Sequence, residues 1–518
     1  MSQPSPPLIV IIGGGFSGTL TAVHLLKRGF ATNGRLVLVN RSGAMARGVA
    51  YGTTSEFHVL NVPAGRMSAF DDDPDSFVRF VRSRGELADG GSVESGPVDG
   101  GSFVGRHLYG AYLESLLADT CAQVGDGHVE RLNTEVVAIE PEHDPTGAWA
   151  WVSLRDGRRL RATRVVLAVG NYPPEDPPVD CDGFFASSAR YIRDPWSSGA
   201  FDRLDLTAPI LLIGTGLTMV DVALQLEALG ASTTMTAVSR RGLLPASHRS
   251  PAHVPHTNDL PADLIEGPAN TRAYVRSVRR HVRKKELEGI NWRDTIAALR
   301  PVTAQLWSEL SVAERARFLR HVRPFWEVHR HRMAPPLWDA FERLRTSGRV
   351  NVIAGRIMQI REEGRRDGGN GDRAAISGSA TVTVRVRPRG SHDLRELTVG
   401  AVVNCSGPSG DTRRLRDPLF DRLRLQGLVR PDPLGLGIDV SPHGALIDND
   451  GFESPFLFYV GPFLRSRDWE ATAVPELRVY ARRLADHLLE TMPARDNAGS
   501  PFTQPRPDES PITLDTRR

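Results

Sequence analysis

The sequence predicts an α/β fold with two dinucleotide-binding (Rossmann) units and a helical insertion in the second. Three observations support this: a strand–glycine turn–helix pattern at residues 8–26, a second one at 208–230, and later apolar strands that run into glycines. Such a turn lets the backbone approach a pyrophosphate and offers it the free N–H groups of a helix N-terminus. One turn alone is weak support, but two turns with these strands in this order favour a two-dinucleotide-binding protein.

The first turn follows the apolar run 8–12 and has the complete G-x-G-x-x-G spacing. The first glycine makes the tight turn, the second allows close approach to a pyrophosphate, and the third lets the helix pack on the strand. We therefore predict that the turn and the first residues of the helix bind a dinucleotide. The order of the two units favours FAD as this dinucleotide. The residues are Gly13, Gly15, Phe16, Ser17 and Gly18.

The second turn is looser, because Gly214 and Gly216 are followed by Met219 where the third glycine would stand. The next strand ends in Arg240 and Arg241. Acidic residues at this place favour NAD, whereas arginines suit a 2′-phosphate, so we predict NADPH as the second nucleotide. The alternative is that the two arginines are ordinary surface residues of an arginine-rich chain.

Three further strands run into a glycine: residues 164–171, which contain Gly170, residues 400–408, and residues 455–462, which contain Gly461. Their order indicates an FAD domain that is split in sequence, with the NADP domain inserted into it. A helical stretch, interpreted as a lid or substrate subdomain, interrupts the second unit. The predicted segments are the FAD domain at 1–205 and 399–491, the NAD(P) domain at 206–398 with its insertion at 259–345, and a disordered tail at 492–518.

Composition narrows the function classes. The chain has 518 residues, 40% of them hydrophobic and 24% charged, and a net charge of +3, which does not favour nucleic-acid binding. Its three cysteines form no C-x-x-C pair and no zinc pattern, so we predict no metal site and no redox dithiol. No signal peptide and no apolar run of transmembrane length occur, and we expect a cytoplasmic protein without a membrane partner. The oligomeric state is not predicted.

Several longer motifs carry a family resemblance that extends from about residue 8 to residue 490. The motifs are ARGVAYGT at 46–53, HVLNVPAGRMSAF at 58–70, GLTMVDVALQL at 216–226, SRRGLLP at 239–245, RFLRHVRPFWEVHRHRMAP at 317–335, VVNCSGP at 402–408 and WEATAVPELR at 469–478. With these motifs the chain resembles a largely uncharacterised bacterial family of FAD/NAD(P)-binding oxidoreductases, related to flavin-dependent N-monooxygenases of the nitrosuccinate-synthase type, which act on aspartate.

The resemblance implies further flavin-binding positions, with two departures from the usual pattern. Asn40 stands where an acidic residue usually meets the FAD ribose, and Pro462 follows Gly461 where an aspartate is common. Baeyer–Villiger chemistry is disfavoured, because the stretch before the second turn keeps Trp196 but no histidine. The implied cofactor-binding residues are Asn40, Arg41, Asn61, Arg66, Met67 and Thr472. For Asn61 and Thr472 a turn-forming or helix-capping role is the alternative.

The predicted activity is that of a monooxygenase which uses FAD, NADPH and molecular oxygen. It would oxidise a nitrogen of a small polar amine or amino acid through a flavin C4a-hydroperoxide, since the cofactor carries the difficult chemistry. Arginines and histidines at 320–332 would hold a substrate carboxylate or the NADP phosphates, although a solvated helix face is the plainer interpretation. The residues that perform catalysis are not predicted. Two alternatives remain: a dehydrogenase or reductase without oxygen insertion, and a non-catalytic nucleotide-binding protein.

Overall fold

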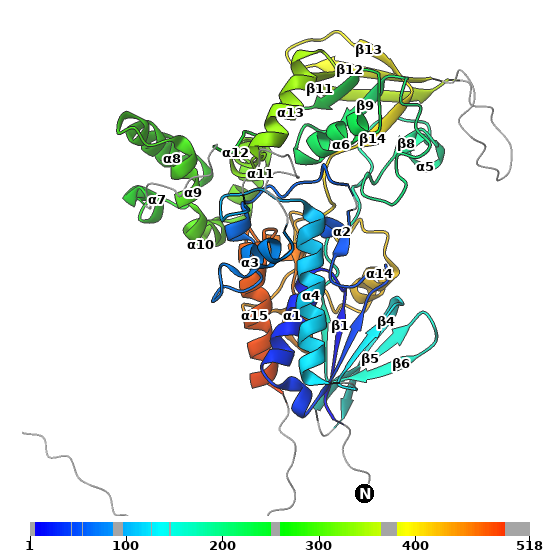
Figure 1. Cartoon of the computed structure of the whole chain (residues 1–518), viewed down its shortest axis with the longest axis vertical. Coiled ribbons are helices and arrows are strands. Elements are labelled where there is room, and N and C mark those ends of the chain that lie inside the picture. The colour runs from blue at the N-terminus through cyan, green and yellow to red at the C-terminus, as the bar shows by residue number, and fades with distance from the viewer. Residues whose placement is uncertain are drawn as a thin grey trace, which may run out of the picture.

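The computed structural model describes residues 6–42, 44–53, 55–85, 97–125, 127–144, 147–249, 259–363 and 381–492. Two α/β units follow each other along the long axis of the molecule, and a group of helices projects to one side (Figure 1). We call them the first unit, the second unit and the helical insertion. The predicted disordered tail lies outside the described residues from residue 493 onward.

The first unit is built on a six-stranded sheet with the strand order β15-β16-β7-β1-β2-β3. All neighbouring strands are parallel except the pair β15–β16 at one edge. The central strands are short apolar runs because both of their faces are buried. The strands are β1 (Leu8–Ile12), β2 (Arg35–Val39), β3 (Val129–Leu132), β7 (Arg164–Leu167), β15 (Ala445–Ile447) and β16 (Glu453–Tyr459).

Alternate side chains of β1 enter two separate cores. Ile9 and Ile11 pack with three helices, α1 (Phe16–Lys27), α4 (Arg106–Val124) and α15 (Val474–Glu490). Val10 and Ile12 pack toward a small antiparallel sheet on the opposite face, and Figure 1 shows the two layers. This second sheet consists of β4 (Val136–Asp144), β5 (Gly147–Leu154) and β6 (Arg159–Ala162). The unit is therefore a three-layer sandwich whose C-terminal helix α15 comes from the far end of the chain.

The second unit has a seven-stranded sheet with the order β13-β12-β11-β10-β9-β14-β8. The neighbouring strands β11, β10, β9, β14 and β8 pair in parallel. At one edge of the sheet, β11, β12 and β13 pair antiparallel. Helices α6 (Leu217–Ala228) and α13 (Pro335–Thr346) pack on one face. The strands are β8 (Tyr191–Ile192), β9 (Ile210–Ile213), β10 (Met235–Ser239), β11 (Val350–Glu362), β12 (Val382–Pro388), β13 (Arg395–Val399) and β14 (Ala401–Asn404).

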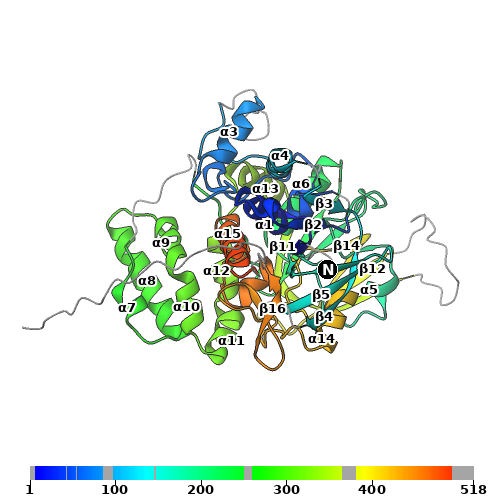
Figure 2. The same cartoon turned by 90° about the horizontal axis from the view of Figure 1, so that it is seen from below.

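The helical insertion leaves the second unit after β10 and returns through α13. The predicted helical character of this region is confirmed, but α13 packs in the core of the second unit through Phe341 and Leu344, so the projecting part ends before it. Figure 2 shows these helices standing apart from the two sheets. They are α7 (Ala262–Ile265), α8 (Thr271–Leu287), α9 (Trp292–Ala298), α10 (Thr303–Glu309), α11 (Val312–His321) and α12 (Arg323–Arg330).

Specific polar contacts fasten the insertion to the first turn of α15 and to the segment that precedes this helix. Arg300 makes a two-bonded ion pair with Glu476 at 2.5 and 2.6 Å. Arg465 Nη2 lies 2.6 Å from Glu327 Oε1, and Trp307 Nε1 donates to the backbone oxygen of Ser466 at 2.9 Å. Forked arginine–carboxylate pairs fix orientation as well as distance. The insertion is therefore docked on the first unit as well as connected to the second.

The sheet membership corrects two predicted domain boundaries. β8 lies before the predicted boundary at residue 205 and β14 lies after the one at 398, yet both strands belong to the sheet of the second unit. An apolar strand that runs into a glycine looks the same in either unit, so the sequence pattern does not assign it. The remaining short elements are α2 (Gly48–Tyr51), α3 (Ser76–Ser83), α5 (Phe184–Ser187), α14 (Pro418–Leu425) and the 3₁₀ turns Phe30–Thr32, Ala64–Arg66, Arg300–Val302 and Pro462–Ser466.

Candidate functional site

The first glycine turn has the geometry that its spacing predicts. Gly13 has φ +111°, and a Cβ at this position would collide with the backbone oxygen of Ala168. A Cβ on Gly18 would collide with the backbone oxygen of Gly13, which explains the close packing of α1 on the sheet. Gly15 differs, because a Cβ there would be in ordinary contact with Gly48 Cα at 3.5 Å. Two of the three glycines are therefore required by the fold, and the third leaves the turn free of side chains.

Helix α1 begins directly after this turn and has no side-chain cap. Its N-cap residue is Gly15, and no acidic residue lies in its first turn. The first N–H groups of the helix are thus free of a side-chain acceptor, and its positive dipole end favours an anion. This arrangement fits the pyrophosphate of a dinucleotide. Phe16 and Ser17 are buried, and Phe16 stacks on Tyr109 with ring centroids 6.2 Å apart, so their side chains support the turn from the core.

Three predicted residues lie together at the carboxyl edge of the first sheet. Gly13, Gly170 and Gly461 follow the adjacent parallel strands β1, β7 and β16. Gly170 and Gly461 both have positive φ, at +71° and +149°. Ligands of open parallel sheets bind in the crevice outside this edge. The structure thus brings the three positions to the place where the pattern predicts a cofactor.

Asn40 and Arg41 end strand β2 at the same edge, but their side chains have partners within the protein. Asn40 accepts a hydrogen bond from the Gly14 N–H at 3.3 Å and donates to the Ala44 oxygen at 2.8 Å, so it fixes the glycine turn. Arg41 pairs with Asp417 at 3.2 Å. One lone pair of the Asn40 oxygen stays available to a ribose, and contact of either residue with FAD stays a prediction.

The second glycine turn opens into a cavity of about 590 Å³. Gly214 has φ +117° and a Cβ there would lie 2.6 Å from the Cys405 oxygen, so the turn itself requires glycine. A Cβ on Gly216 would meet no atom within 4 Å, since this residue faces the cavity. Helix α6 starts at Gly216 without a side-chain cap. The site has the size and the free helix N-terminus that a dinucleotide phosphate needs.

Arginines from three parts of the chain line this nucleotide cavity. Arg240 and Arg241 do so from the end of β10, and their contact with a 2′-phosphate stays a prediction. Arg356 and Arg387 face each other across the β11–β12 pair, and they were missed by the sequence analysis. The alternation of arginines in RVRPR at 385–389 was the available signal. The complete set of lining arginines is Arg240, Arg241, Arg320, Arg356, Arg387 and Arg389.

The basic and aromatic run at 320–332 contributes to two separate surfaces. Arg320 and His321 line the nucleotide cavity. Trp326 and Arg330 contact Glu470 of the first unit, with Trp326 Nε1 donating to Glu470 Oε1 at 3.1 Å and Arg330 Nη2 3.0 Å from Glu470 Oε2. The run is therefore neither one phosphate site nor one solvated face.

The loop predicted to lie beside the flavin reaches both units. The backbone oxygen of Asn61 lies 3.0 Å from His248 Nε2, which follows the second unit's strand β10. Met67 is buried in the core of the first unit, so its side chain packs rather than faces a ligand. Arg66 points away from that core and is accessible to solvent. Of the three residues, Arg66 offers the side chain most suited to an anion.

Arg66 belongs to a group of positive charges where the two units and the insertion meet. Arg332 is buried, and burial together with Arg330, Arg293 and Arg66 lowers its pKa to about 10. Although part of the Arg66 side chain is open to solvent, partial desolvation together with the charges of Arg300 and Arg330 lowers its pKa. Within the described part of the chain, the guanidinium groups of Arg66 and Arg332 have no carboxylate partner. We call Arg66, Arg293, Arg330 and Arg332 the arginine cluster.

His248 lies against the same cluster. Burial and the charge of Arg332 lower its pKa to about 3, so the imidazole is neutral at physiological pH. Converging cations without carboxylate partners are costly in the free protein and favour an anionic ligand. The cluster is therefore a candidate site for a carboxylate.

The side chains just before α15 do not cap this helix, in contrast to the alternative role considered for Thr472. Glu470 is buried and holds Trp326 and Arg330 instead of capping the helix. Thr472 is exposed, and the N-cap of α15 is Ala473 without a side-chain hydrogen bond. The N-terminus of α15 is thus uncapped, as are those of α1 and α6. Binding of Thr472 to a cofactor stays a prediction.

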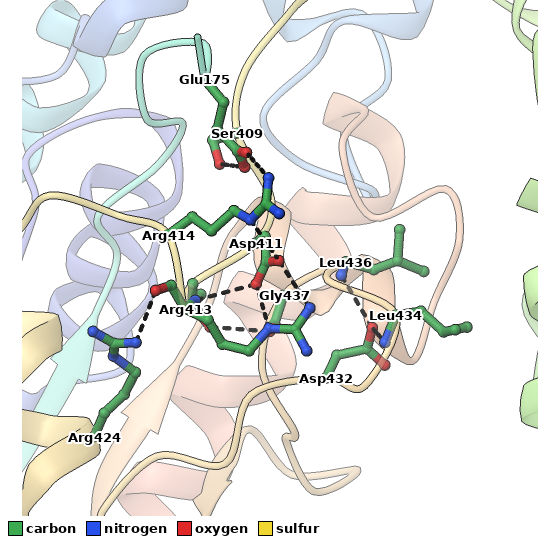
Figure 3. Close-up of polar contacts among 11 residues, drawn as sticks. Glu175, Ser409, Asp411, Arg413, Arg414, Arg424, Asp432, Leu434, Leu436 and Gly437 are labelled. Carbon is green, nitrogen blue, oxygen red and sulfur yellow. Dashed lines mark hydrogen bonds and ion pairs between the residues drawn. The ribbon is translucent and has the colours of Figure 1, made fainter. Parts of the chain in front are cut away.

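A polar network shapes the chain where it returns from the second unit to the first (Figure 3). Glu175 accepts hydrogen bonds from Ser409 Oγ at 2.7 Å and from Arg414 at 3.1 Å. Buried Asp432 accepts from the N–H groups of Leu434 and Leu436 at 2.9 and 3.0 Å. This turn sets the two leucines against the tryptophans of the insertion interface. The network fixes the course of the chain at this crossover.

Among the described residues, no group of three or more His, Cys, Asp or Glu side chains is arranged to hold a metal ion. None of the helices that the structure describes is long and apolar enough to cross a membrane.

The comparisons with known proteins agree with this architecture. Residues 10–172 match a family described as FAD-NAD(P)-binding. No curated protein matches the chain.

Solved structures of flavin N-hydroxylases share the fold over nearly the whole chain. The reduced ornithine hydroxylase of Pseudomonas aeruginosa has a TM-score of 0.59 and 16% identity, covering 94% of this chain and 100% of that one. An ornithine N-hydroxylase of Kutzneria sp. 744, solved with reduced FAD, NADP⁺ and L-ornithine, has a TM-score of 0.61 and 14% identity, covering 94% and 99%. The FAD-bound cadaverine monooxygenase of Erwinia amylovora has a TM-score of 0.59 and 12% identity, covering 96% and 99%.

The fold is therefore that of the two-dinucleotide-binding flavoproteins, as the sequence predicts. The match of residues 10–172 to a family described as FAD-NAD(P)-binding agrees with the predicted resemblance.

Proposed function

We propose that the protein is an FAD- and NADPH-dependent monooxygenase that oxidises the nitrogen of a small amine-bearing acid such as aspartate. The observation that carries the proposal is the arginine cluster, in which Arg66 and Arg332 converge without a carboxylate partner among the described residues. The shared fold with ornithine and cadaverine hydroxylases supports the reaction class.

The residues that would hold the two nucleotides lie at the two glycine turns. FAD would bind at the turn 13–18 and the carboxyl edge of the first sheet, and NADPH would bind in the cavity at Gly216 with its 2′-phosphate among the lining arginines. When bound, FAD supplies the redox chemistry, because it accepts a hydride from NADPH and lets oxygen react.

The chain itself would bind and orient the substrate. A guanidinium grips a carboxylate with two parallel hydrogen bonds, so Arg332 and Arg66 would fix the amino acid and present its amine in one direction. The docked insertion would exclude bulk water from this place. Only an unprotonated amine can accept an oxygen atom, so turnover should rise with pH until another group fails.

The test is to supply the yellow, FAD-loaded protein with NADPH, oxygen and a panel of amino acids. Aspartate, or another acid of the panel, should raise NADPH oxidation and oxygen uptake above the background and yield a nitrogen-oxidised product. If no acid raises either rate, the amino-acid proposal is wrong. A protein that stays colourless after incubation with FAD would overturn the flavoprotein assignment as well.

A reductase without oxygen insertion is the second candidate. One solved structure favours this candidate. The bacillithiol disulfide reductase of Staphylococcus aureus shares the fold, with a TM-score of 0.52 and 11% identity. Against a disulfide substrate, Cys121, Cys181 and Cys405 are all unpaired thiols, and burial raises the pKa of Cys405 well above its usual value. NADPH oxidation that proceeds with an artificial electron acceptor and yields no oxygenated product would favour this candidate. Failure of NADPH to reduce the bound flavin would instead favour the non-catalytic alternative.

A further inference from the structure

A second cavity, of about 710 Å³, lies inside the helical insertion and shares only His321 with the lining of the nucleotide cavity. Helices α7 to α12 supply most of its walls, and Trp469 of the first unit also lines it. Its size is that of pockets that bind small organic molecules. The lining is mainly apolar and includes seven aromatic residues: Tyr274, Trp292, Trp307, Phe318, Phe325, Trp326 and Trp469. We call it the aromatic cavity.

The floor of the aromatic cavity is deep and fixed. Trp307 and Trp469 are each only 3% exposed, and their ring centroids lie 4.7 Å apart. The guanidinium of Arg465 covers Trp469 at 4.0 Å, which holds the ring in place. A preformed floor of this kind suits a planar or branched apolar group, since aromatic rings stack without further rearrangement.

Several neutral polar groups of the lining already have partners. Trp307 Nε1 donates to the Ser466 oxygen and Trp326 Nε1 to Glu470. The hydroxyl of Thr303 donates to the Leu299 oxygen at 2.8 Å. Trp307 and Trp326 therefore present ring carbon to the cavity, and recognition of a ligand body there would be mainly apolar.

The rim, in contrast, carries charge. Arg279 and Arg283 lie one turn apart on α8, both are exposed, and neither has an ion pair with any residue that the structure describes. Glu286 is the acidic residue of the lining, so the three α8 side chains leave one net positive charge. An anionic group on a ligand would meet complementary charge at the rim and apolar surface below.

We propose that the aromatic cavity binds a small molecule with an aromatic body and a single carboxylate. The ring would lie against Trp307 and Trp469, and the carboxylate would reach Arg279 and Arg283. This proposal does not rest on N-oxygenation, because the cavity is separate from the arginine cluster. It predicts a binding site whether or not the bound molecule is oxidised.

The probe for the test is 4-phenylbutyrate, compared with its neutral amide and with succinate. Four of the eight tryptophans line the cavity, so tryptophan fluorescence excited at 295 nm reports occupancy, and titration calorimetry gives the stoichiometry. We expect saturable binding of one 4-phenylbutyrate per chain to the FAD-loaded protein. The amide should bind at least tenfold more weakly, and succinate should not change the fluorescence.

Two variants and one control separate the contributions. Arg279→Ala with Arg283→Ala should reduce the affinity for the acid to that for the amide, and Val278→Trp should block both by filling the cavity. Arg276→Ala is the matched control, because Arg276 is an exposed residue of α8 outside the cavity and its loss should leave binding unchanged. Acid and amide binding equally to the wild type, or no binding by either method, would overturn the proposal. A concentration-dependent dimer that Arg279→Ala/Arg283→Ala disrupts would also overturn it, since the face would then serve a second copy of the chain.

Discussion

Arg106 Nη2 lies 2.8 Å from Asp221 Oδ2, and this ion pair joins the two units. Arg106 is the first residue of α4 in the first unit, whereas Asp221 belongs to α6 in the second. The Asp221 carboxylate is 4% exposed, and its burial raises its pKa while Arg106 lowers it. The arginine also lies over the Trp196 ring at 5.5 Å. A largely buried ion pair thus helps to fix the relative position of the two units.

We predict that Arg106→Met destabilises the protein by about 3–5 kcal/mol, because it leaves a buried carboxylate without its partner. Arg106→Met combined with Asp221→Leu should lose less than the sum of the single changes. Urea unfolding of the four proteins measures this coupling. Additive losses would show that the pair does not hold the units together.

The same interface makes stability sensitive to acid through His58. Burial and the charge of Arg106 lower its pKa to about 4, whereas the unfolded chain has a value near 6.5. Between these values the unfolded state binds the extra proton. Neutral His58 therefore makes its full contribution to stability above pH 6.5. The free energy of unfolding should fall as the pH decreases toward 4, by roughly 3 kcal/mol at most.

His58→Gln should reduce this decline without abolishing it, because His24 and His248 also have lowered pKa values of about 4 and about 3. The measurement is the unfolding free energy from pH 7.5 to 4. A substitution of exposed His392 serves as control and should leave the slope unchanged. An identical slope in the His58 variant would contradict the assignment.

Discrimination of NADPH from NADH should depend on two groups of arginines in the nucleotide cavity, those that follow β10 and those on the β11–β12 pair. Arg240→Ala with Arg241→Ala should raise the KM for NADPH far more than that for NADH, since each charge-assisted hydrogen bond to the 2′-phosphate contributes about 1.5–3 kcal/mol.

The strand pair should contribute in the same direction, so Arg356→Ala with Arg387→Ala should also raise the KM for NADPH. Arg385→Ala is the control, because this neighbour on β12 pairs with Glu396 outside the cavity. Equal increases for NADPH and NADH in either double variant would show that those arginines act structurally.

The two glycines of the second turn should respond differently to the same substitution. Gly216→Val should fold and keep its FAD, because its side chain would enter open cavity space, but NADPH should no longer reduce the flavin. Gly214→Val should instead fold poorly, since its φ of +117° and the Cys405 oxygen leave no room. Flavin content, circular dichroism and the rate of flavin reduction distinguish the two effects. Normal reduction by NADPH in the Gly216 variant would place the nucleotide elsewhere.

The glycine turns could be predicted from the sequence because their requirement is local. A positive φ at Gly13 or Gly214, and helix packing at Gly18, restrict the residue type within a few positions of the chain. The assignment of β8 and β14 to a sheet was different, because pairing partners far along the chain decide it.

The arginine cluster could not be predicted from the sequence for the same reason. Arg66 and Arg332 come from different units and meet only through the docking of the insertion, so no spacing in the sequence relates them. Arg356 and Arg387 are paired by strand register, which an arginine-rich sequence hides. Sequence patterns therefore located the nucleotide turns, whereas long-range packing assembles the candidate substrate site.

Arg332 offers the sharpest test of that site, because substrate binding and stability should change in different ways. Arg332→Met should raise the KM for the amino-acid substrate roughly 10- to 100-fold, because one charge-assisted contact is lost. It should leave the melting temperature unchanged or raise it, since it removes a buried charge that has no carboxylate partner in the described structure. Arg349→Met is the opposite case, because Arg349 pairs with Glu227 at 2.9 Å and donates to the Thr233 oxygen, so it should lower stability without changing the KM. Thermal unfolding and substrate-dependent oxygen uptake measure both effects. A strongly destabilised Arg332 variant with unchanged KM would show that the cluster supports the fold and not the substrate.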